Sequence, residues 1–256
     1  MLVLKKTKLG ETDLIITGFS EDGSQIRAVA KGARRPGSKL AVPLELYSVT
    51  RVLLYEGKGL GIIREVALID SNETCRSDVI HSAGAAVIVE LIEQISSEGN
   101  TEARLFPLAR EALRCLGKAP EEGVFLIAAA AALKIAAQVG YRPSTLNCVL
   151  CGVKTQAPQE PRLSRAETHV YFSFDDGGVV CCSCFSTAQE QGYQKLDTQI
   201  VAWTQTLISS RFSEIEAFTG AEYRTLGAPM LGFARNWVCF HVVKKLKSLD
   251  ILLSFA

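Results

Sequence analysis

Two Cys-x-x-Cys steps constrain this chain more than any other feature. Cys148 and Cys151 form the first step, and Cys181 and Cys184 form the second. Each x-x turn holds its two sulfurs close enough to share an ion, so four thiolates can surround one zinc ion tetrahedrally. Glycine follows the first step and an Asp-Asp-Gly-Gly turn precedes the second, so the backbone can bend sharply at both. The spacing therefore predicts a four-cysteine zinc site.

Buried free thiols and a redox pair are the alternatives to a metal site. Two matching pairs argue against isolated thiols, and neither pair adjoins the βαβ pattern that carries a redox Cys-x-x-Cys. His169 lies between the steps and could replace a ligand, although a solvated loop histidine is the simpler interpretation. The sequence also leaves open whether Cys182 contacts the metal. The simplest expectation for Cys75, Cys115, Cys182 and Cys239 is that they are small core residues or idle thiols.

The predicted zinc is structural, because a catalytic zinc keeps three protein ligands and one open position. Zinc deaminases carry His-x-Glu and Pro-Cys-x-x-Cys. None of the three histidines has Glu two residues on, and Asn147 and Val180 precede the cysteine pairs in place of proline. We therefore expect one structural zinc per chain.

Length and composition indicate a folded protein with ample core. The chain has 256 residues, of which 48% are hydrophobic and 21% charged, enough for two domains or one large one. No apolar run reaches the roughly 18 residues that span a bilayer, and no basic-then-apolar leader opens the chain. We expect a cytoplasmic protein without membrane association.

Positive charge gathers in one stretch although the whole chain carries only +1. Between Arg27 and Arg64 there are eight basic residues, opposed by Glu45 and Glu56 alone. A local basic patch on a nearly neutral protein is typical of a phosphate-backbone binder.

The first 70 residues are predicted to form a five-stranded oligonucleotide-binding (OB) barrel. Apolar and β-branched runs are separated by glycines or charged turns, and Glu21-Asp22-Gly23 is a hairpin signal. Ile26, Ala28 and Ala30 alternate with more polar neighbours, as in a half-buried strand. The expected strands are 2–6, 13–19, 25–31, 46–54 and 60–69.

A basic loop leaves the third of these strands. It carries four cations, two glycines and a proline within nine residues and has no acid. Glycine allows close approach to a phosphate chain, and long cationic side chains can follow that chain without reading bases. A solvated loop is the alternative. The sequence gives weaker support for base stacking. The aromatic residues of the barrel region are Phe19, Tyr47 and Tyr55, and each could be a core residue. The expected phosphate contacts are Lys31, Arg34, Arg35, Lys39, Arg51, Lys58 and Arg64.

Helical periodicity begins at Ser77, which is placed to cap a first helix. Further helices are expected at 102–116, 121–139, 197–209, 214–219 and 226–249. The cysteine segment is therefore an insertion in a helical domain. The expected division is an OB domain at 1–72, a helical domain at 73–146 and 186–256, and a zinc module at 147–185. The fold class is α+β and multidomain.

The last predicted helix is apolar almost all round near Trp237 and Phe240, and it continues into Lys244 and Lys245. A buried helix with a cationic end, favoured by the helix dipole, is the plain interpretation. The alternative is a groove with a cationic rim that receives an acidic, apolar-tipped peptide.

The order and spacing of several segments resemble the RecO family of bacterial recombination mediators over nearly the whole chain. The similar segments are Gly10–Ile15, Val29–Arg35, Leu44-Glu45, Leu53–Leu60, Leu146–Gly152, Gly177–Cys184 and Lys244–Leu249. Some members of the family lack the cysteines, so the resemblance supports a metal in the zinc-bearing branch only.

The resemblance implies an OB barrel, a helical domain and a zinc module, with no catalytic residues and no small-molecule substrate. It implies binding of single- and double-stranded DNA, annealing of complementary strands and help in loading RecA onto strands coated by single-strand-binding protein (SSB). The implied partners are RecR and the acidic SSB tail. Our own placement of that tail is at the end of the last predicted helix, near Trp237, Phe240, Lys244 and Lys245. The expected setting is the bacterial cytoplasm, at the nucleoid. Rival hypotheses are an RNA-binding or ribosome-associated OB-fold protein, a zinc-dependent enzyme acting on nucleic acid and a thiol redox protein.

Overall fold

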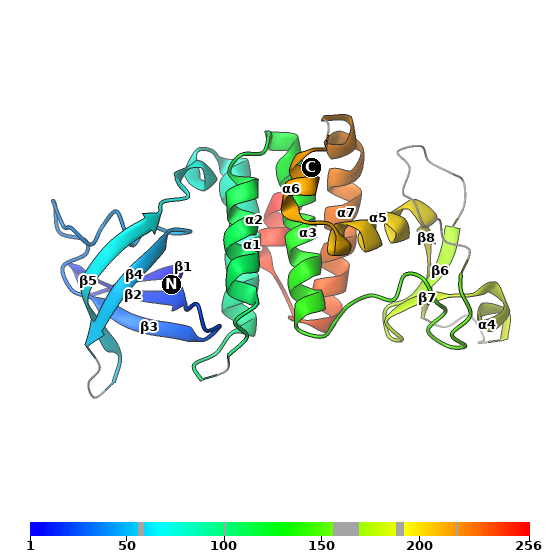
Figure 1. Ribbon diagram of the computed structural model, residues 1–256, viewed down its shortest axis with the longest axis horizontal. Helices are drawn as coiled ribbons and strands as arrows, with labels where there is room; N and C mark the ends of the chain where they lie inside the picture. Colours follow the sequence, from blue (N-terminus) through cyan, green and yellow to red (C-terminus); the bar gives the residue numbers. More distant parts are fainter. Residues whose placement is uncertain (56–58, 100, 156–168, 188–191, 219) are drawn as a thin grey trace. The chain divides into compact units, whose positions relative to one another are not determined.

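The computed structural model describes residues 1–55, 59–99, 101–155, 169–187, 192–218 and 220–256. The chain folds into two compact units, Met1–Ala119 and Pro120–Ala256. The first unit holds the barrel and two helices, and the second holds the remaining helices and the cysteine segment (Figure 1). The four-part division expected from the sequence stays a prediction.

The predicted OB barrel is confirmed. Five strands close in the order β1-β2-β3-β5-β4, with β1 pairing back to β4 at Leu2 and Val49. All pairs are antiparallel except β3 with β5. The strands are β1 (Leu2–Leu9), β2 (Asp13–Phe19), β3 (Gln25–Ala30), β4 (Val49–Tyr55) and β5 (Gly61–Asp70).

Alternation of side chains builds the barrel interior. Ala28 and Ala30 are buried while Arg27, next to Ala28, is exposed, as the sequence pattern predicts. The interior also contains Val3, Leu14, Ile16, Leu44 and Ile63. Extra residues at Arg64 and Ile69 break the β4–β5 register, and such bulges add the local twist that helps a short sheet close.

Two helices complete the first unit. After a 3₁₀ turn (Glu73–Arg76), α1 spans Val79–Ile95 and α2 spans Leu105–Leu116. The α1 helix begins one residue later than expected, because Asp78, and not Ser77, accepts a hydrogen bond from the His81 amide at 2.8 Å. Phe106 of α2 stacks on Phe19 of β2 with ring centroids 6.4 Å apart, which joins helices and barrel in one core.

The second unit is built around α3 (Glu121–Gln138), whose residues from Gly123 to Leu133 are all buried. Its alanine run lets α7 (Gly220–His241) pack closely, and Gly227 of α7 leaves room for the Cβ of Phe125. The other helices are α4 (Cys182–Thr187), α5 (Thr198–Ser209), α6 (Phe212–Glu216) and α8 (Lys247–Leu253). No helix in these described ranges has the length and apolar character needed to cross a membrane.

A small sheet that the sequence did not predict lies beside the cysteines. Its order is β7-β6-β8, formed by β6 (His169–Ser173), β7 (Gly178–Val180) and β8 (Tyr193–Asp197). Phe172 of β6 is fully buried against Phe233 and Trp237 of α7. The cysteine segment is therefore attached to the helical core by aromatic packing.

The single long helix expected at 226–249 is wrong. The α7 helix ends at His241, and α8 begins again at Lys247. Val242 and Val243 both donate to the Val238 carbonyl, which closes the helix. Leu246 then turns inward in an extended conformation and is fully buried.

Candidate metal centre and nucleic-acid interface

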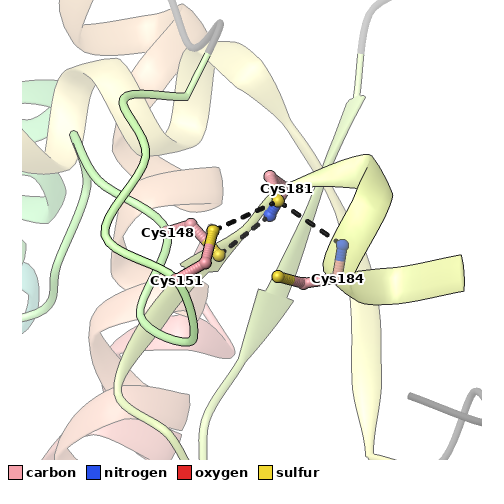
Figure 2. A group of neighbouring side chains, drawn as sticks. All are labelled: Cys148, Cys151, Cys181 and Cys184. Atoms are coloured by element: carbon pink, nitrogen blue, oxygen red, sulfur yellow. Dashed lines mark hydrogen bonds between the residues drawn. The ribbon is translucent and has the colours of Figure 1, made fainter. Parts of the chain in front are cut away.

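The four predicted cysteine ligands come together. One sulfur from each of Cys148, Cys151, Cys181 and Cys184 lies within 4.8 Å of the other three (Figure 2). The sulfurs of Cys151 and Cys181 are 3.7 Å apart. A tetrahedral zinc with Zn–S bonds of about 2.3 Å places its sulfurs about 3.8 Å apart. The cluster therefore has the size of a four-thiolate zinc site.

Backbone contacts fix the first cysteine pair against the second. Gly152, with φ of +76°, donates to the Cys148 carbonyl at 2.8 Å and closes the first turn. Val149 donates to Val179 of β7 at 3.0 Å. Gly178 permits this approach, because a Cβ there would lie 2.9 Å from the Val149 side chain and 2.3 Å from the Ser144 carbonyl oxygen.

The second pair is placed at a strand-to-helix junction. Cys181 directly follows β7, and Cys184 lies on α4, which begins at the next residue (Figure 2). The Cys181 amide points at the Cys148 sulfur at 3.3 Å, and the Cys184 amide points at the Cys181 sulfur at 3.5 Å. Amide donors aimed at sulfur favour the thiolate form, which is the form that binds metal.

The ionisation of the cluster also suits a cation. Burial by itself would raise the pKa of Cys148, but amide groups of Cys181, Cys151 and Leu150 outweigh it and lower that pKa to about 6. Contacts with the sulfurs of Cys151 and Cys181 raise the pKa of Cys184 to about 12. The Cys148 thiolate therefore forms readily and the Cys184 thiolate does not, so a site with both thiols ionised needs a positive ion among the sulfurs.

Neither Cys182 nor His169, the two further ligands that the sequence leaves open, joins the cluster. Within the described residues the close group of possible ligands consists of the four cysteines. Cys182 is exposed, and His169 lies at the start of β6 with its ring packed edge-on to Tyr171. The arrangement can hold one metal ion with every position filled by protein, which is the pattern of a structural site.

The basic loop is exposed on the barrel. Lys31, Arg34, Arg35 and Lys39 all present their side chains to solvent, in a run of turns that follows β3. Arg51 on β4 and Arg64 on β5 are exposed as well. Lys58 lies outside the described residues. The role of these cations as phosphate contacts stays a prediction.

Contacts with the β1–β2 turn anchor the base of the basic loop. Asp13 accepts a hydrogen bond from the Gly32 amide at 2.8 Å, and Gly32 has φ of +66°. The Arg34 amide donates to Thr12 at 2.9 Å. The Arg34 guanidinium donates to the carbonyls of Gly10 and Glu11 at 3.3 and 2.9 Å. Arg34 thus helps to position the loop, a role that sequence reasoning missed because its partners lie on a distant part of the chain.

The four residues expected to form a peptide site differ in exposure. Trp237 is 1% exposed and donates from Nε1 to the Tyr141 carbonyl at 2.8 Å. Phe240 is 53% exposed and packs beside Phe174. Lys244 and Lys245 lie in the connection between α7 and α8, and both are exposed to solvent. Trp237 is therefore a core residue beneath this surface.

An OB barrel, a helical region and a close four-cysteine cluster define the class: a multidomain α+β protein with an N-terminal OB fold and a cluster that could hold one metal ion. The family model described as "Recombination protein O N terminal" matches residues 1–72, and the one described as "Recombination protein O C terminal" matches residues 76–250. Together these matches cover most of the chain.

Curated relatives agree with the family models. The DNA repair protein RecO of Thermoanaerobacter sp. is 30% identical over 72% of this chain and 68% of its own length. That of Desulfitobacterium hafniense is 31% identical over 72% and 62%. That of Desulforamulus reducens is 25% identical over 98% and 91%. This chain belongs to the RecO family of DNA repair proteins.

Proposed function

We propose that this protein is a recombination mediator that binds single- and double-stranded DNA and anneals complementary strands. With RecR it helps to load RecA onto SSB-coated strands, and it makes or breaks no covalent bond. The observation that carries the proposal is the exposed, acid-free basic loop, which is anchored to an OB barrel in a DNA repair family. Its setting is the bacterial cytoplasm, at the nucleoid.

The mechanism is electrostatic. Annealing requires two polyanions to approach, and cations on one protein surface lower that repulsion. Lys31, Arg35 and Lys39 extend into solvent, so they can follow a sugar-phosphate chain without reading its bases. Arg34 contributes charge and also holds the loop in place.

Zinc is the ion proposed for the four cysteines. Sulfur ligands in a tetrahedral arrangement favour zinc over magnesium or calcium, which prefer oxygen. The ion's contribution is to fix the cysteine segment, which packs on α7 through Phe172. DNA binding is assigned to the barrel and not to the metal.

The acidic SSB tail is proposed to bind near the end of α7. Phe240 offers an exposed aromatic ring, and Lys244 and Lys245 offer cations a few residues further on. Trp237 supports this surface from the core. Acidic, apolar-tipped peptides are the chemistry that such a surface would take.

Salt dependence tests the DNA proposal most simply. The double variant Lys31→Ala, Arg35→Ala is expected to bind single strands more weakly, with a slope of log K against log salt smaller by about 1.4, since each lost contact removes about 0.7. The matched control is Arg142→Ala, Arg224→Ala, which removes two exposed arginines of the second unit. An unchanged slope in the loop variant would contradict the proposal, and tighter binding of RNA than of DNA would favour the RNA-binding alternative.

A further inference from the structure

The barrel has three aromatic residues among those the structure describes, and one of them faces solvent. Phe19 is fully buried, and Tyr47 is 3% exposed with its hydroxyl donating to the Ser82 carbonyl at 3.1 Å. Tyr55, the last residue of β4, is 57% exposed. The core therefore accounts for two of the three aromatic rings and leaves the third to be explained.

A bulge places an arginine on this ring. In the β4–β5 ladder Leu53 pairs with Glu65 and Leu54 pairs with Ile63, so Arg64 is the extra residue. A bulge turns its extra side chain out of the regular alternation. The Arg64 guanidinium carbon lies 5.3 Å from the centre of the Tyr55 ring. A planar cation and an aromatic ring are thus presented at one point of the barrel.

Several residues near this pair in the sequence are also exposed. Leu53, two residues before Tyr55 on the same strand, is 57% exposed, and Leu60, the residue before β5, is 38% exposed. Arg51 is exposed two residues before Leu53, and Glu65 is the acid opposite Leu53. A flat ring with two arginines nearby suits a ligand that is itself flat, apolar on its faces and linked to phosphate.

We propose that Tyr55 and Arg64 form a subsite that stacks an unpaired nucleobase of single-stranded DNA. This inference rests on the proposed DNA-binding function and assigns its strand preference. Aromatic rings and guanidinium planes stack on bases without regard to sequence, because every base has a π-face. In a duplex the bases already stack on each other, so the subsite acts on single strands only. The loop cations then bind the backbone of either form.

The test compares Tyr55→Ala with Tyr55→Phe on single- and double-stranded DNA. Loss of one stacked base costs roughly 5- to 150-fold in single-strand affinity. We expect this loss for Tyr55→Ala, with duplex affinity and the salt slope unchanged, since no charge is removed. Tyr55→Phe keeps the ring and is expected to keep the affinity. A strand containing 2-aminopurine reports stacking directly, through quenching that wild type and Tyr55→Phe produce and Tyr55→Ala does not.

Leu53→Ala is the matched control, because Leu53 is on the same strand and equally exposed but not aromatic. Its single-strand affinity is expected to stay within about twofold of wild type, since it offers no π-face to a base. Arg64→Lys keeps the charge and loses the planar cation, so it is expected to weaken single-strand binding at an unchanged salt slope.

The two proposals fail in different ways. If the wild-type protein binds neither form of DNA, the proposed function fails. If it binds both, and Tyr55→Ala weakens neither, weakens both equally or matches Leu53→Ala, the stacking subsite is overturned. If Tyr55→Ala unfolds at the same temperature as wild type, a loss of affinity in this variant is not caused by a folding defect.

Discussion

Asp13 shows how one carboxylate can anchor the basic loop. The Gly32 amide, the Thr12 hydroxyl and the nearby cations of Arg35 and Lys31 lower the pKa of Asp13, although some desolvation opposes them. A carboxylate whose pKa is lower in the folded state stabilises that state above its ordinary pKa of about 3.9. The contribution is therefore complete at neutral pH and is lost as the pH falls below about 4.

Asp13→Ala is expected to loosen the basic loop. The Gly32 amide loses its acceptor, so its hydrogen exchange should accelerate, and DNA affinity should fall several-fold because the loop cations lose their fixed positions. Glu11→Ala is the control, since it removes an acid from the same turn and leaves the Glu11 carbonyl that accepts from Arg34. Unchanged Gly32 exchange in Asp13→Ala, or an equal loss of affinity in Glu11→Ala, would contradict this role.

Residue types and spacing predicted that the four cysteines come together, because the geometry within each Cys-x-x-Cys pair is local. They did not predict the Asp13 anchor or the outward position of Tyr55. Both depend on barrel closure, which brings Asp13 to Gly32 and sets the bulge at Arg64. A pattern in one strand carries no information on its partner strand's bulge.

At the scale of secondary-structure elements, Lys134 of α3 supports the end of α5. Its ammonium donates to the carbonyls of Ile208, at 2.9 Å, and of Ser210. Ile208 lies in the last turn of α5 and Ser210 directly follows the helix, where a cation complements the helix dipole. Burial lowers the pKa of Lys134 to about 8, against an opposing contribution from Glu214.

The lowered pKa of Lys134 gives a prediction with a definite sign. Between about pH 8 and 10.5 the unfolded chain holds this proton and the folded chain releases it, so this group makes folding more favourable as the pH rises. Lys134→Met should remove that contribution, so the difference in unfolding temperature between wild type and variant should change across this window. Lys118→Met, at a lysine on the surface of the first unit, is the control. If the unfolding temperatures of wild type and Lys134→Met change with pH in parallel, the lowered pKa of Lys134 is contradicted.

The elements themselves were predictable to different degrees. Barrel strands were placed within a few residues because alternation in β2 and β3 is strong. The last helix was not, since its break depends on Leu246 turning inward and on Arg235 of α7 meeting Asp250 of α8 at 2.7 Å. The β6–β8 sheet was missed because its residues pair with partners that the local pattern does not reveal.

At the scale of the whole molecule, we assign DNA binding to the barrel and metal binding to the helical body. The family matches cover both parts, from residue 1 to residue 72 and from 76 to 250. The cysteine segment is held to the helical core by the rings of Phe172, Phe233 and Trp237. Loss of a metal ion from the cysteines should therefore lower the stability of the second unit more than it lowers the affinity for DNA.

Cys148→Ser is expected to abolish stoichiometric zinc and to lower the unfolding temperature by on the order of 10 °C, since a tightly bound ion stabilises the folded state by several kcal/mol. Metal analysis and thermal unfolding on the same preparation measure both. The control is Cys182→Ser, which changes an exposed cysteine beside the cluster and should retain one zinc per chain. Equal zinc in Cys148→Ser and wild type would refute the four-cysteine site, and a redox-active disulfide in place of metal would favour the thiol alternative.

Annealing of complementary strands, with zinc measured on the same sample, tests the central claim most directly. We expect Lys31→Ala, Arg35→Ala to anneal strands much more slowly than wild type while still holding one zinc per chain. Annealing at the wild-type rate by this variant would contradict the assignment of DNA binding to the basic loop of the barrel.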